Sequence, residues 1–593
     1  MKKLLSDYCI QGSPGNPVIK RRKKEGGTAV YLALWCTIFL YLERGFIMTQ
    51  KEYADMLLPN VLHDRAYYED LYKKRNLSDG AMVTRIGPSP TGFVHIGTLY
   101  QAMVAERMAH QSGGVCFVRV EDTDQKRLVE GAIDQILNSV KEYNIKFDEY
   151  PLDNGESVGE YGPYIQTMRK DIYQAFVKDL LMKDLAYPSF LTSEELNEIN
   201  EKQKKRKQRI GYYGIWASKE RSLTHEEVKE KIESGLPYVI RLKSKGSFDN
   251  EIVMEDCIKG RIKFPENDMD VVLLKSDGIP TYHFAHVVDD TLMGTTHVSR
   301  GDEWLSSVPV HLDLFKTLGF APPKYAHLAT IQKEENGKRR KISKRKDAEA
   351  NVAFYSEKGV PVEAVKIYLM TLANSNFEEW FLNNPDKNYK EFHMDFKNMS
   401  ASGALFDMEK LLNIAKNYLS RITASEFYNE LLTWASTYDK EFLHELEEYK
   451  DIIIKTLDIE RNTNKPRKDY AMYSEVRQNI SYMYDFKDIN YEWQKITDIT
   501  EIKSILNTYI NEYYDESLNE EEWFNNIKAM CDKLGYASNM KEYKKNPENF
   551  KGNVADVSTV IRVSLTGKSK TPNLYDIICI LGREEIVRRI GLL

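Results

Sequence analysis

The chain of 593 residues has little of several features that would restrict its class. Its six cysteines lie far apart and no pair forms a C-x-x-C, so neither a disulfide framework nor a thiolate metal site is indicated. The charge has no large excess of one sign, since 83 Lys and Arg stand against 89 Asp and Glu for a formal net charge of −6. This disfavours a protein that coats polyanions without selectivity, although a local basic face can still bind nucleic acid.

No apolar run reaches the roughly 18–20 residues that a membrane-spanning helix needs. The longest candidate, 28–42, follows the basic stretch 20–24 and resembles a signal peptide, but no small-residue cleavage site comes after it. We therefore expect residues 1–47 to be an N-terminal extension that contributes nothing to the fold. We expect a cytoplasmic monomer without a membrane partner.

The composition is that of a soluble globular protein, with 42% hydrophobic and 29% charged residues. Because single hydrophobic cores stop growing near roughly 250–300 residues, this length predicts two to four domains.

The segment around residues 81–120 has the pattern of a doubly wound α/β sheet. An apolar stretch at 81–83 leads into a Gly- and Pro-rich turn, after which apolar residues recur at helical spacing from Leu99. A second buried strand is expected at 115–120, with Glu121 at its carboxyl end. Ligands of such sheets bind outside the carboxyl ends of the strands.

The rest of the chain divides by pattern into an insertion, a return to the sheet and a helical region. The pattern is mixed at 185–270, strand signals return at 271–274 and 281–288, and helical periodicity persists beyond Leu405. We therefore predict a Rossmann-like, doubly wound α/β domain with an α+β insertion and an all-helical C-terminal region. The predicted boundaries are 1–47, 48–184, 185–270, 271–400 and 401–593.

A basic run in the insertion, 202–209, carries six positive charges in eight residues. A solvated helix face is the ordinary explanation of such a run, and a phosphate-binding surface is the alternative. The positions considered for nucleic-acid contact are Lys204, Lys205, Arg206 and Lys207.

Two short motifs carry the chemistry. His95-Ile96-Gly97-Thr98 begins the first predicted helix, whose N-terminal N–H groups and partial positive charge suit a polyphosphate. Far downstream, Lys341-Ile342-Ser343-Lys344-Arg345 belongs to a strongly cationic segment expected to be a flexible loop. Each motif alone also has an ordinary structural explanation: the first can be a helix cap and the second a solvated loop.

Together, in this order and separation, the two motifs resemble the signature sequences of class I aminoacyl-tRNA synthetases. From about Met48 to the C-terminus the chain resembles bacterial-type glutamyl-tRNA synthetases. The resemblance implies that glutamate and ATP form glutamyl-adenylate and diphosphate, after which the glutamyl group passes to the 3′ end of tRNA(Glu) with release of AMP. It implies that Mg²⁺ accompanies the nucleotide.

The resemblance also implies roles for single residues. His95, Lys341 and Lys344 are the expected catalytic residues. ATP binding is expected of His95, Gly97, Thr98, Glu303, Trp304, Lys341, Ser343 and Lys344. Glutamate binding is expected of Arg85, Ser89, Glu121, Tyr282, His286 and Arg300.

Some positions depart from the family pattern. Gly87 replaces a commoner alanine, a change expected only to loosen the turn, and His286 stands where asparagine is usual. Some relatives hold zinc in the insertion through cysteines near Tyr187. Here Ser189 and Phe190 supply no thiolate and Cys257 is alone, so zinc is not expected.

Several alternatives remain open at this stage. A glutaminyl-tRNA synthetase shares the catalytic fold, but its first motif differs at Ser89 and Thr91 and it lacks the arginine at position 300. A truncated relative that glutamylates a modified tRNA base lacks the region after Leu405. A catalytically inactive RNA-binding paralogue is the alternative from another class. Whether tRNA(Gln) is charged as well stays open.

Overall fold

The computed structural model describes residues 8–11, 18–21, 48–90, 92–129, 131–152, 155–385 and 387–593. The first described strands, β1 (Tyr8–Gln11) and β2 (Val18–Arg21), pair antiparallel. The apolar run 28–42, expected to contribute nothing to the fold, lies outside the described residues. No helix within the described ranges is long and apolar enough to cross a bilayer.

The catalytic sheet is built from two parallel strand pairs. Strand β3 (Val83–Ile86) pairs with β4 (Val115–Val118), and β12 (His297–Gly301) pairs with β13 (Lys324–Leu328). The pairs lie side by side, because the Thr296 amide donates to the Val83 carbonyl oxygen at 3.0 Å and the Val83 amide donates to Thr296 Oγ1 at 2.8 Å. All four residues of β3 are buried, as expected of a strand covered on both faces. The predicted doubly wound α/β domain is confirmed.

Helix α4 (Ile96–Gln111) crosses from β3 to β4 and packs on both strands. The other helices around the sheet are α2 (Gln50–Leu57), α3 (Arg65–Leu71), α5 (Ala132–Glu142), α6 (Lys170–Met182), α10 (Tyr282–Leu292) and α11 (Val308–Leu318). Short strands β5 (Tyr150–Pro151) and β6 (Ser157–Val158) form a small hairpin. One large core joins α4 to the sheet and to later helices, and a second surrounds α6 and α10.

The insertion is an antiparallel unit with helices on it. Strands β7 (Ala186–Ser189), β8 (Val239–Leu242) and β11 (Val272–Leu274) form one sheet in the order β11-β8-β7. Its helices are α7 (Ser193–Lys205), α8 (Ser218–Arg221) and α9 (His225–Glu233), and β9 (Glu251–Asp256) and β10 (Gly260–Pro265) form a hairpin. The strand expected at 271–274 is present, but it pairs with β8 of the insertion and not with the catalytic sheet.

Two local predictions were wrong. The strand expected at 281–288 is helix α10, whose apolar Phe284, Ala285, Val287 and Val288 are buried at helical spacing. A short apolar run does not distinguish a strand from a buried helix. The segment 338–341, expected to be a flexible loop, is strand β15 (Lys338–Lys341), paired with β14 (Gln332–Glu335) across the Asn336-Gly337 turn, both residues of which have positive φ.

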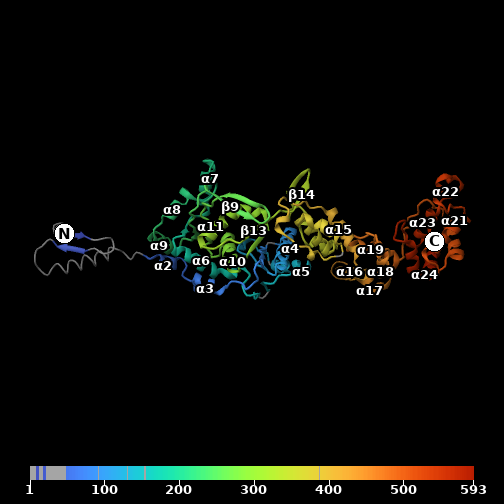
Figure 1. Ribbon diagram of the computed structural model, residues 1–593, viewed down its shortest axis with the longest axis horizontal. Helices are drawn as coiled ribbons and strands as arrows, with labels where there is room; N and C mark the ends of the chain where they lie inside the picture. Colours follow the sequence, from blue (N-terminus) through green and yellow to red (C-terminus); the bar gives the residue numbers. More distant parts are fainter. Residues whose placement is uncertain are drawn as a thin grey trace.

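No strand follows Lys341 in the described part of the chain. The helices are α12 (Ala353–Lys358), α13 (Val362–Ala373), α14 (Ser375–Asn383), α15 (Met408–Arg421), α16 (Ala424–Tyr438), α17 (Lys440–Glu448), α18 (Lys450–Asp458), α19 (Val476–Ile480), α20 (Ile499–Thr508), α21 (Glu520–Leu534), α22 (Met540–Lys545), α23 (Val554–Thr566) and α24 (Leu574–Gly591). Separate cores form around α16–α18 and α20–α24. Helices α16–α24 lie toward the opposite end of the long axis from α7–α9 (Figure 1).

Candidate active site

An open cleft of about 540 Å³ brings the two sequence motifs together at the carboxyl ends of β3 and β12. This size is within the usual range for small-molecule sites. All eight residues predicted to bind ATP line the cleft, as does Ser89 of the predicted glutamate set. They come from the turn after β3, the start of α4, the segment after β12, and the end of β15 with the segment that follows it.

His95 caps helix α4 with its own ring. Its Nδ1 accepts a hydrogen bond from the Gly97 amide at 2.9 Å. A Cβ at position 97 would approach Nδ1 to 3.0 Å, so glycine lets the ring close over the helix end. Burial, with Lys341 and Lys344 nearby, lowers the pKa of His95. A neutral ring that accepts at Nδ1 carries its proton on Nε2. A hydrogen bond to the Ile342 backbone opposes the lowering of the pKa.

The two lysines of the downstream motif, residues 341–345, have different contacts. Lys341 Nζ lies 2.6 Å from Glu303 Oε1, across the cleft in the short helix η5 (Asp302–Ser307). Lys344 Nζ donates to the Phe93 carbonyl oxygen at 2.8 Å and lies over the Phe93 ring. The Ser343 amide donates to Asp347 Oδ2 at 2.8 Å.

Arg340, also in the basic run, has a structural role. It donates to both carboxylate oxygens of Asp347, at 2.6 and 2.8 Å, and to Glu335 at 2.6 Å. These bonds hold the β14–β15 hairpin against the segment that carries Ser343. The hydrogen bonds from Arg340 lower the pKa of Asp347 to about 2, so this carboxylate is an anion at any physiological pH.

Beneath the cleft lies a buried network of arginines and carboxylates. Arg85 contacts both oxygens of Asp290 at 3.3 Å, and Arg119 donates to Asp290 at 2.6 Å and to Glu121 at 3.0 Å. Although burial alone would raise it, Arg119 and Arg85 hold the pKa of Asp290 well below its ordinary value. Burial raises the pKa of Glu121 against the opposing effect of Arg119. A second carboxylate, Asp289, accepts from Arg169 at 2.7 Å.

Arg300 differs from these arginines because it has no ion pair among the described residues. It is 3% exposed at the end of β12. Its Nε donates to His327 Nε2 at 3.1 Å, its Nη1 lies 3.2 Å from His311 Nδ1, and its Nη2 reaches the Trp304 carbonyl oxygen at 3.4 Å. A guanidinium has five N–H groups. Two of them therefore have no partner in the described structure, and the buried charge lacks a contacting anion.

Aromatic rings connect the nucleotide side to the buried arginines. The ring of Tyr282 lies 4.6 Å from that of Trp304 and 5.9 Å from that of His286. His286 is fully buried, and burial lowers its pKa to about 3. Its Nε2 lies 3.0 Å from Tyr325 Oη, and its Nδ1 lies 3.0 Å from both Arg85 Nη2 and Asp290 Oδ2. Because both nitrogens have protein partners, His286 orients Arg85 in this arrangement.

Sequence reasoning missed several residues of the site. Arg119 was assigned only to a strand, and His311 and His327 were not singled out. Gly87 was expected only to loosen its turn, yet a Cβ there would approach Glu121 Oε1 to 2.4 Å. The glycine therefore makes room for this carboxylate. An arginine two residues before Glu121 was the one signal that could have indicated the network.

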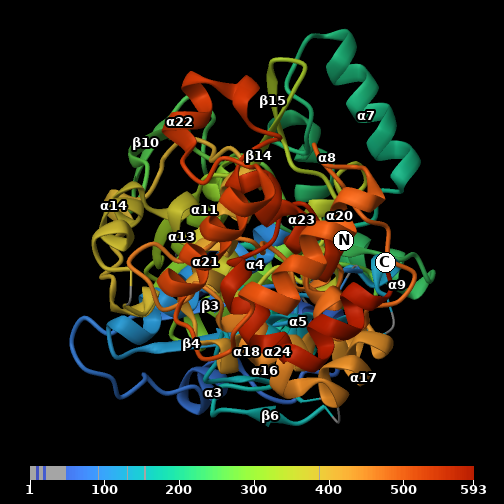
Figure 2. The ribbon, with the colours of Figure 1, turned by 90° about the vertical axis from the view of Figure 1, so that its right-hand side faces the viewer.

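The predicted RNA-contacting residues lie far from the cleft. Lys204, Lys205, Arg206 and Lys207 are exposed at and after the C-terminal end of α7, which projects from the body (Figure 2). Lys204 pairs with Glu201 at 2.6 Å, and the Arg206 guanidinium lies over the Trp216 ring. The part of this run beyond α7 is thus a turn and not a helix face.

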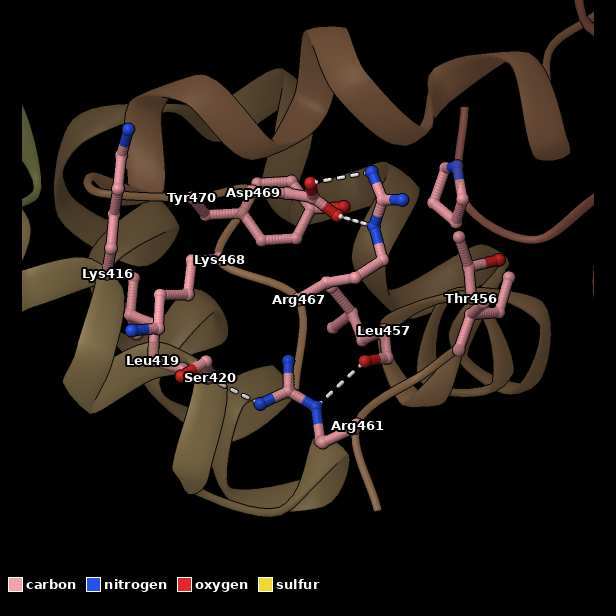
Figure 3. A pocket seen from close by; sticks show the side chains of 12 residues that line it. Lys416, Leu419, Ser420, Thr456, Leu457, Arg461, Arg467, Lys468, Asp469 and Tyr470 are labelled. Carbon is pink, nitrogen blue, oxygen red and sulfur yellow. Dashed lines mark hydrogen bonds and ion pairs between the residues drawn. The ribbon is translucent and has the colours of Figure 1, made fainter. Parts of the chain in front are cut away.

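A second hollow lies in the helical region, beside α15 and α18 (Figure 3). Arg467 makes a bidentate ion pair with Asp469, with both N···O distances at 2.8 Å. Arg461 donates to the Leu457 carbonyl oxygen at 2.8 Å. Lys416 and Lys468 add further positive charge. The hollow measures only about 20 Å³, which is roughly the room of one water molecule, so it accepts neither a phosphate nor a base in this arrangement.

Metal-ligating side chains do not gather in the described residues: no three His, Cys, Asp or Glu are placed to hold an ion. Ser189 is buried in β7, and Cys257 is a half-buried free thiol.

Comparisons with known proteins agree with this geometry. Residues 81–413 match the family model of the catalytic domain of class I tRNA synthetases (E and Q), and residues 426–592 match that of an anticodon-binding domain. The chain is 48% identical over 545 residues to a glutamate–tRNA ligase of Acetivibrio thermocellus, covering 92% of this chain and 99% of that protein. It is 46% identical over 551 residues to one of Clostridium perfringens, covering 92% and 100%.

A solved structure is similar as well. The crystal structure of a glutamate tRNA ligase from Elizabethkingia meningosepticum, in complex with its amino acid, matches 86% of this chain and 98% of its own, with a TM-score of 0.69 and 27% identity. The fold and the site therefore define a class I tRNA synthetase with a helical anticodon-binding domain. Within that class, the chain belongs to the glutamate–tRNA ligase family.

Proposed function

We propose that the chain attaches L-glutamate to the 3′ end of tRNA(Glu) in two steps, through glutamyl-adenylate. One observation carries the proposal: the cleft that joins both synthetase motifs adjoins a buried arginine, Arg300, that no carboxylate of the described residues contacts. A buried cation without a contacting anion favours a negatively charged ligand.

The cations that line the cleft account for the binding of ATP. The N-terminus of α4 and the Nε2–H of His95 bind the phosphates of ATP, and Lys341 and Lys344 stabilise the charge that develops on the leaving diphosphate. Gly97, Thr98 and Ser343 border the phosphates, and Glu303 and Trp304 border the nucleoside. The substrate carboxylate attacks the α-phosphorus, the bond to the β-phosphate oxygen breaks, and no protein nucleophile is needed.

The charges of the buried side chains account for the binding of glutamate. Arg300 and Arg85 pair with the two carboxylates of the substrate, and a guanidinium fork suits such pairing. Glu121 faces the ammonium group, Ser89 supports it by a hydrogen bond, and Tyr282 forms a wall. His286 acts through Arg85. A fully buried cation gains more from a carboxylate than from a neutral amide, which favours glutamate over glutamine.

The RNA side is supported by three projecting basic segments. Helix α7, the β14–β15 hairpin and helix α22 all project from the same side of the molecule (Figures 1 and 2). Exposed cations lie on each of them: Lys204–Lys207, Lys338 with Arg339, and Lys544 with Lys545. A protein of net charge −6 can bind tRNA when its cations gather on one side. We place the acceptor end at the insertion and the anticodon at the helical region.

The proposed reaction also bears on the metal ions, the location and the oligomeric state. Mg²⁺ accompanies ATP, and because no cluster among the described residues is placed to hold it, no step is assigned to it. Zinc is not required by any step. The proposed enzyme acts as a cytoplasmic monomer, and charging of tRNA(Gln) in addition to tRNA(Glu) is an open alternative.

Two experiments test this function. Glutamate-dependent ATP–diphosphate exchange, with and without tRNA, is expected in at least one condition, and the glutamyl group is expected on purified tRNA(Glu). Absence of exchange in both conditions would favour a non-catalytic RNA-binding protein. Exchange that depends on glutamine instead of glutamate would favour a glutaminyl-tRNA synthetase. Parallel charging of purified tRNA(Gln) tests the open alternative.

A further inference from the structure

The position of Arg300 depends on which ring atoms of two histidines lack a proton. Arg300 Nε–H can donate to His327 Nε2 only if that nitrogen is unprotonated. Its Nη1 approaches His311 Nδ1 under the same condition. Burial, with Arg300 nearby, lowers the pKa of both histidines, so both rings are neutral and each must hold its proton on the other nitrogen.

Asp256, at the end of β9, contacts that other nitrogen of His327. Its Oδ2 lies 2.6 Å from His327 Nδ1, and the carboxylate is 4% exposed. Its Oδ1 accepts from the amides of Ile258 and Lys259, both at 2.9 Å. Although burial alone would raise it, His327 and these amides hold the pKa of Asp256 below its ordinary value. Asp256 is therefore an anion that accepts the Nδ1–H of His327.

The three side chains form one chain of bonds from the insertion to the glutamate side. An anion at Nδ1 fixes the proton there and leaves the lone pair of Nε2 toward Arg300. Strand β9 also packs against β13, and directly after β9 the Cys257 amide donates to the Tyr325 carbonyl oxygen at 2.8 Å. No hydrogen bond or ion pair is found between Asp256 and Arg300 in the described structure, so the bonded connection between them runs through His327.

We propose that Asp256 is a positioning residue for glutamate recognition: it fixes the tautomer of His327 and thereby holds the Arg300 guanidinium where it meets a substrate carboxylate. This inference rests on the proposed function. It adds to that function a residue from the β9–β10 hairpin, outside both signature motifs.

Asp256→Asn tests the bond chain with little change of shape. The asparagine oxygen takes the bonds from the Ile258 and Lys259 amides and, at 3.3 Å, the bond from the His327 amide that Asp256 shares between its two oxygens. Its NH₂ group faces His327 Nδ1, which drives the ring to the tautomer with Nε2–H. Two donors, Nε2–H and Arg300 Nε–H, then face each other. We expect the KM for glutamate to rise about tenfold or more, with the KM for ATP changed less than about twofold.

His327→Gln separates this role from a structural one. The Gln side-chain carbonyl can accept from Arg300 and has no tautomer, so D256N in the H327Q background is expected to change the KM for glutamate less than about twofold. An equal effect of D256N in both backgrounds would overturn the proposal. Asp313→Asn is the matched control, because this partly buried carboxylate contacts Ser244 and Asn267.

A spectroscopic readout does not depend on activity. With ¹⁵N-histidine in the whole chain, His327 Nε2 is expected to be unprotonated in the parent protein and protonated in D256N. A protonated Nε2 in the parent would overturn the inference. Arg300→Ala separates the inference from the proposed function. If this variant leaves the KM for glutamate unchanged, the proposed glutamate pocket is wrong. If it raises that KM but D256N does not, only the role of Asp256 is wrong.

Discussion

Lys341 Nζ lies 2.6 Å from Glu303 Oε1, so the late motif and the segment after β12 are joined by an ion pair across the nucleotide side of the cleft. Both side chains are about half exposed, at 52% and 43%. Pairs this exposed stabilise a fold by roughly 0–1 kcal/mol. The pair therefore matters for where the ammonium group is held and not for folding.

Lys341→Ala is expected to lower the rate of ATP–diphosphate exchange about 100-fold, because the variant lacks one cation that stabilises the leaving diphosphate. The KM for glutamate and the thermal midpoint should change little. Lys338→Ala, on the same strand and exposed, is the control and should keep the parent rate when tRNA is saturating. A parent-like rate in the Lys341 variant would remove this residue from the catalytic assignment.

Charge reversal of Lys205 and Lys207 together is expected to weaken tRNA binding. It should also reduce the dependence of log Kd on log salt, by roughly one for each tRNA phosphate that these lysines neutralise in the parent chain. Binding measured at several salt concentrations gives this slope. Lys229→Glu, on α9 in the same insertion, is the control. An unchanged slope in the double variant would indicate that the run is only a solvated surface.

Acid should destabilise the catalytic domain through its buried histidines. Burial lowers the pKa of His286 from 6.5 to about 3, so between these values the unfolded chain binds more protons than the folded one. Stability is therefore full above about pH 6.5 and is lost as the pH falls, by about 2 kcal/mol at pH 5 from this residue alone.

Thermal midpoints at pH 7.5 and pH 5 check this expectation. His286→Asn, which cannot be protonated in this range, should show a smaller loss on acidification than the parent chain. An equal loss in both proteins would mean that His286 does not carry the effect.

The sequence was sufficient for the parts of the site that depend on local pattern. Strand β3, the start of α4 at His95 and the helical region all follow from short-range periodicity and capping. The class of fold and the meeting of the two motifs then followed from the resemblance. Pattern also explains the failure at α10, where buried apolar residues look alike in a strand and in a helix.

The buried partners could not be predicted because they come from distant parts of the chain. Arg119 and Asp290 are 171 positions apart, and His327 and Asp256 are 71 apart. No local spacing links such residues, since the sheet and the insertion bring them together. Likewise, only the tertiary contact explains why position 87 is a glycine, because it lies against the Glu121 carboxylate.

The uncompensated charge of Arg300 is the feature that we propose to select glutamate. It can be tested by comparing glutamate and glutamine as substrates for ATP–diphosphate exchange, in the presence of tRNA, for the parent chain and for Arg300→Ala. We predict strong preference for glutamate in the parent, and in the variant a loss of about 100-fold or more in kcat/KM for glutamate with the KM for ATP nearly unchanged. A variant that keeps the parent preference and the parent KM for glutamate would contradict this role of Arg300.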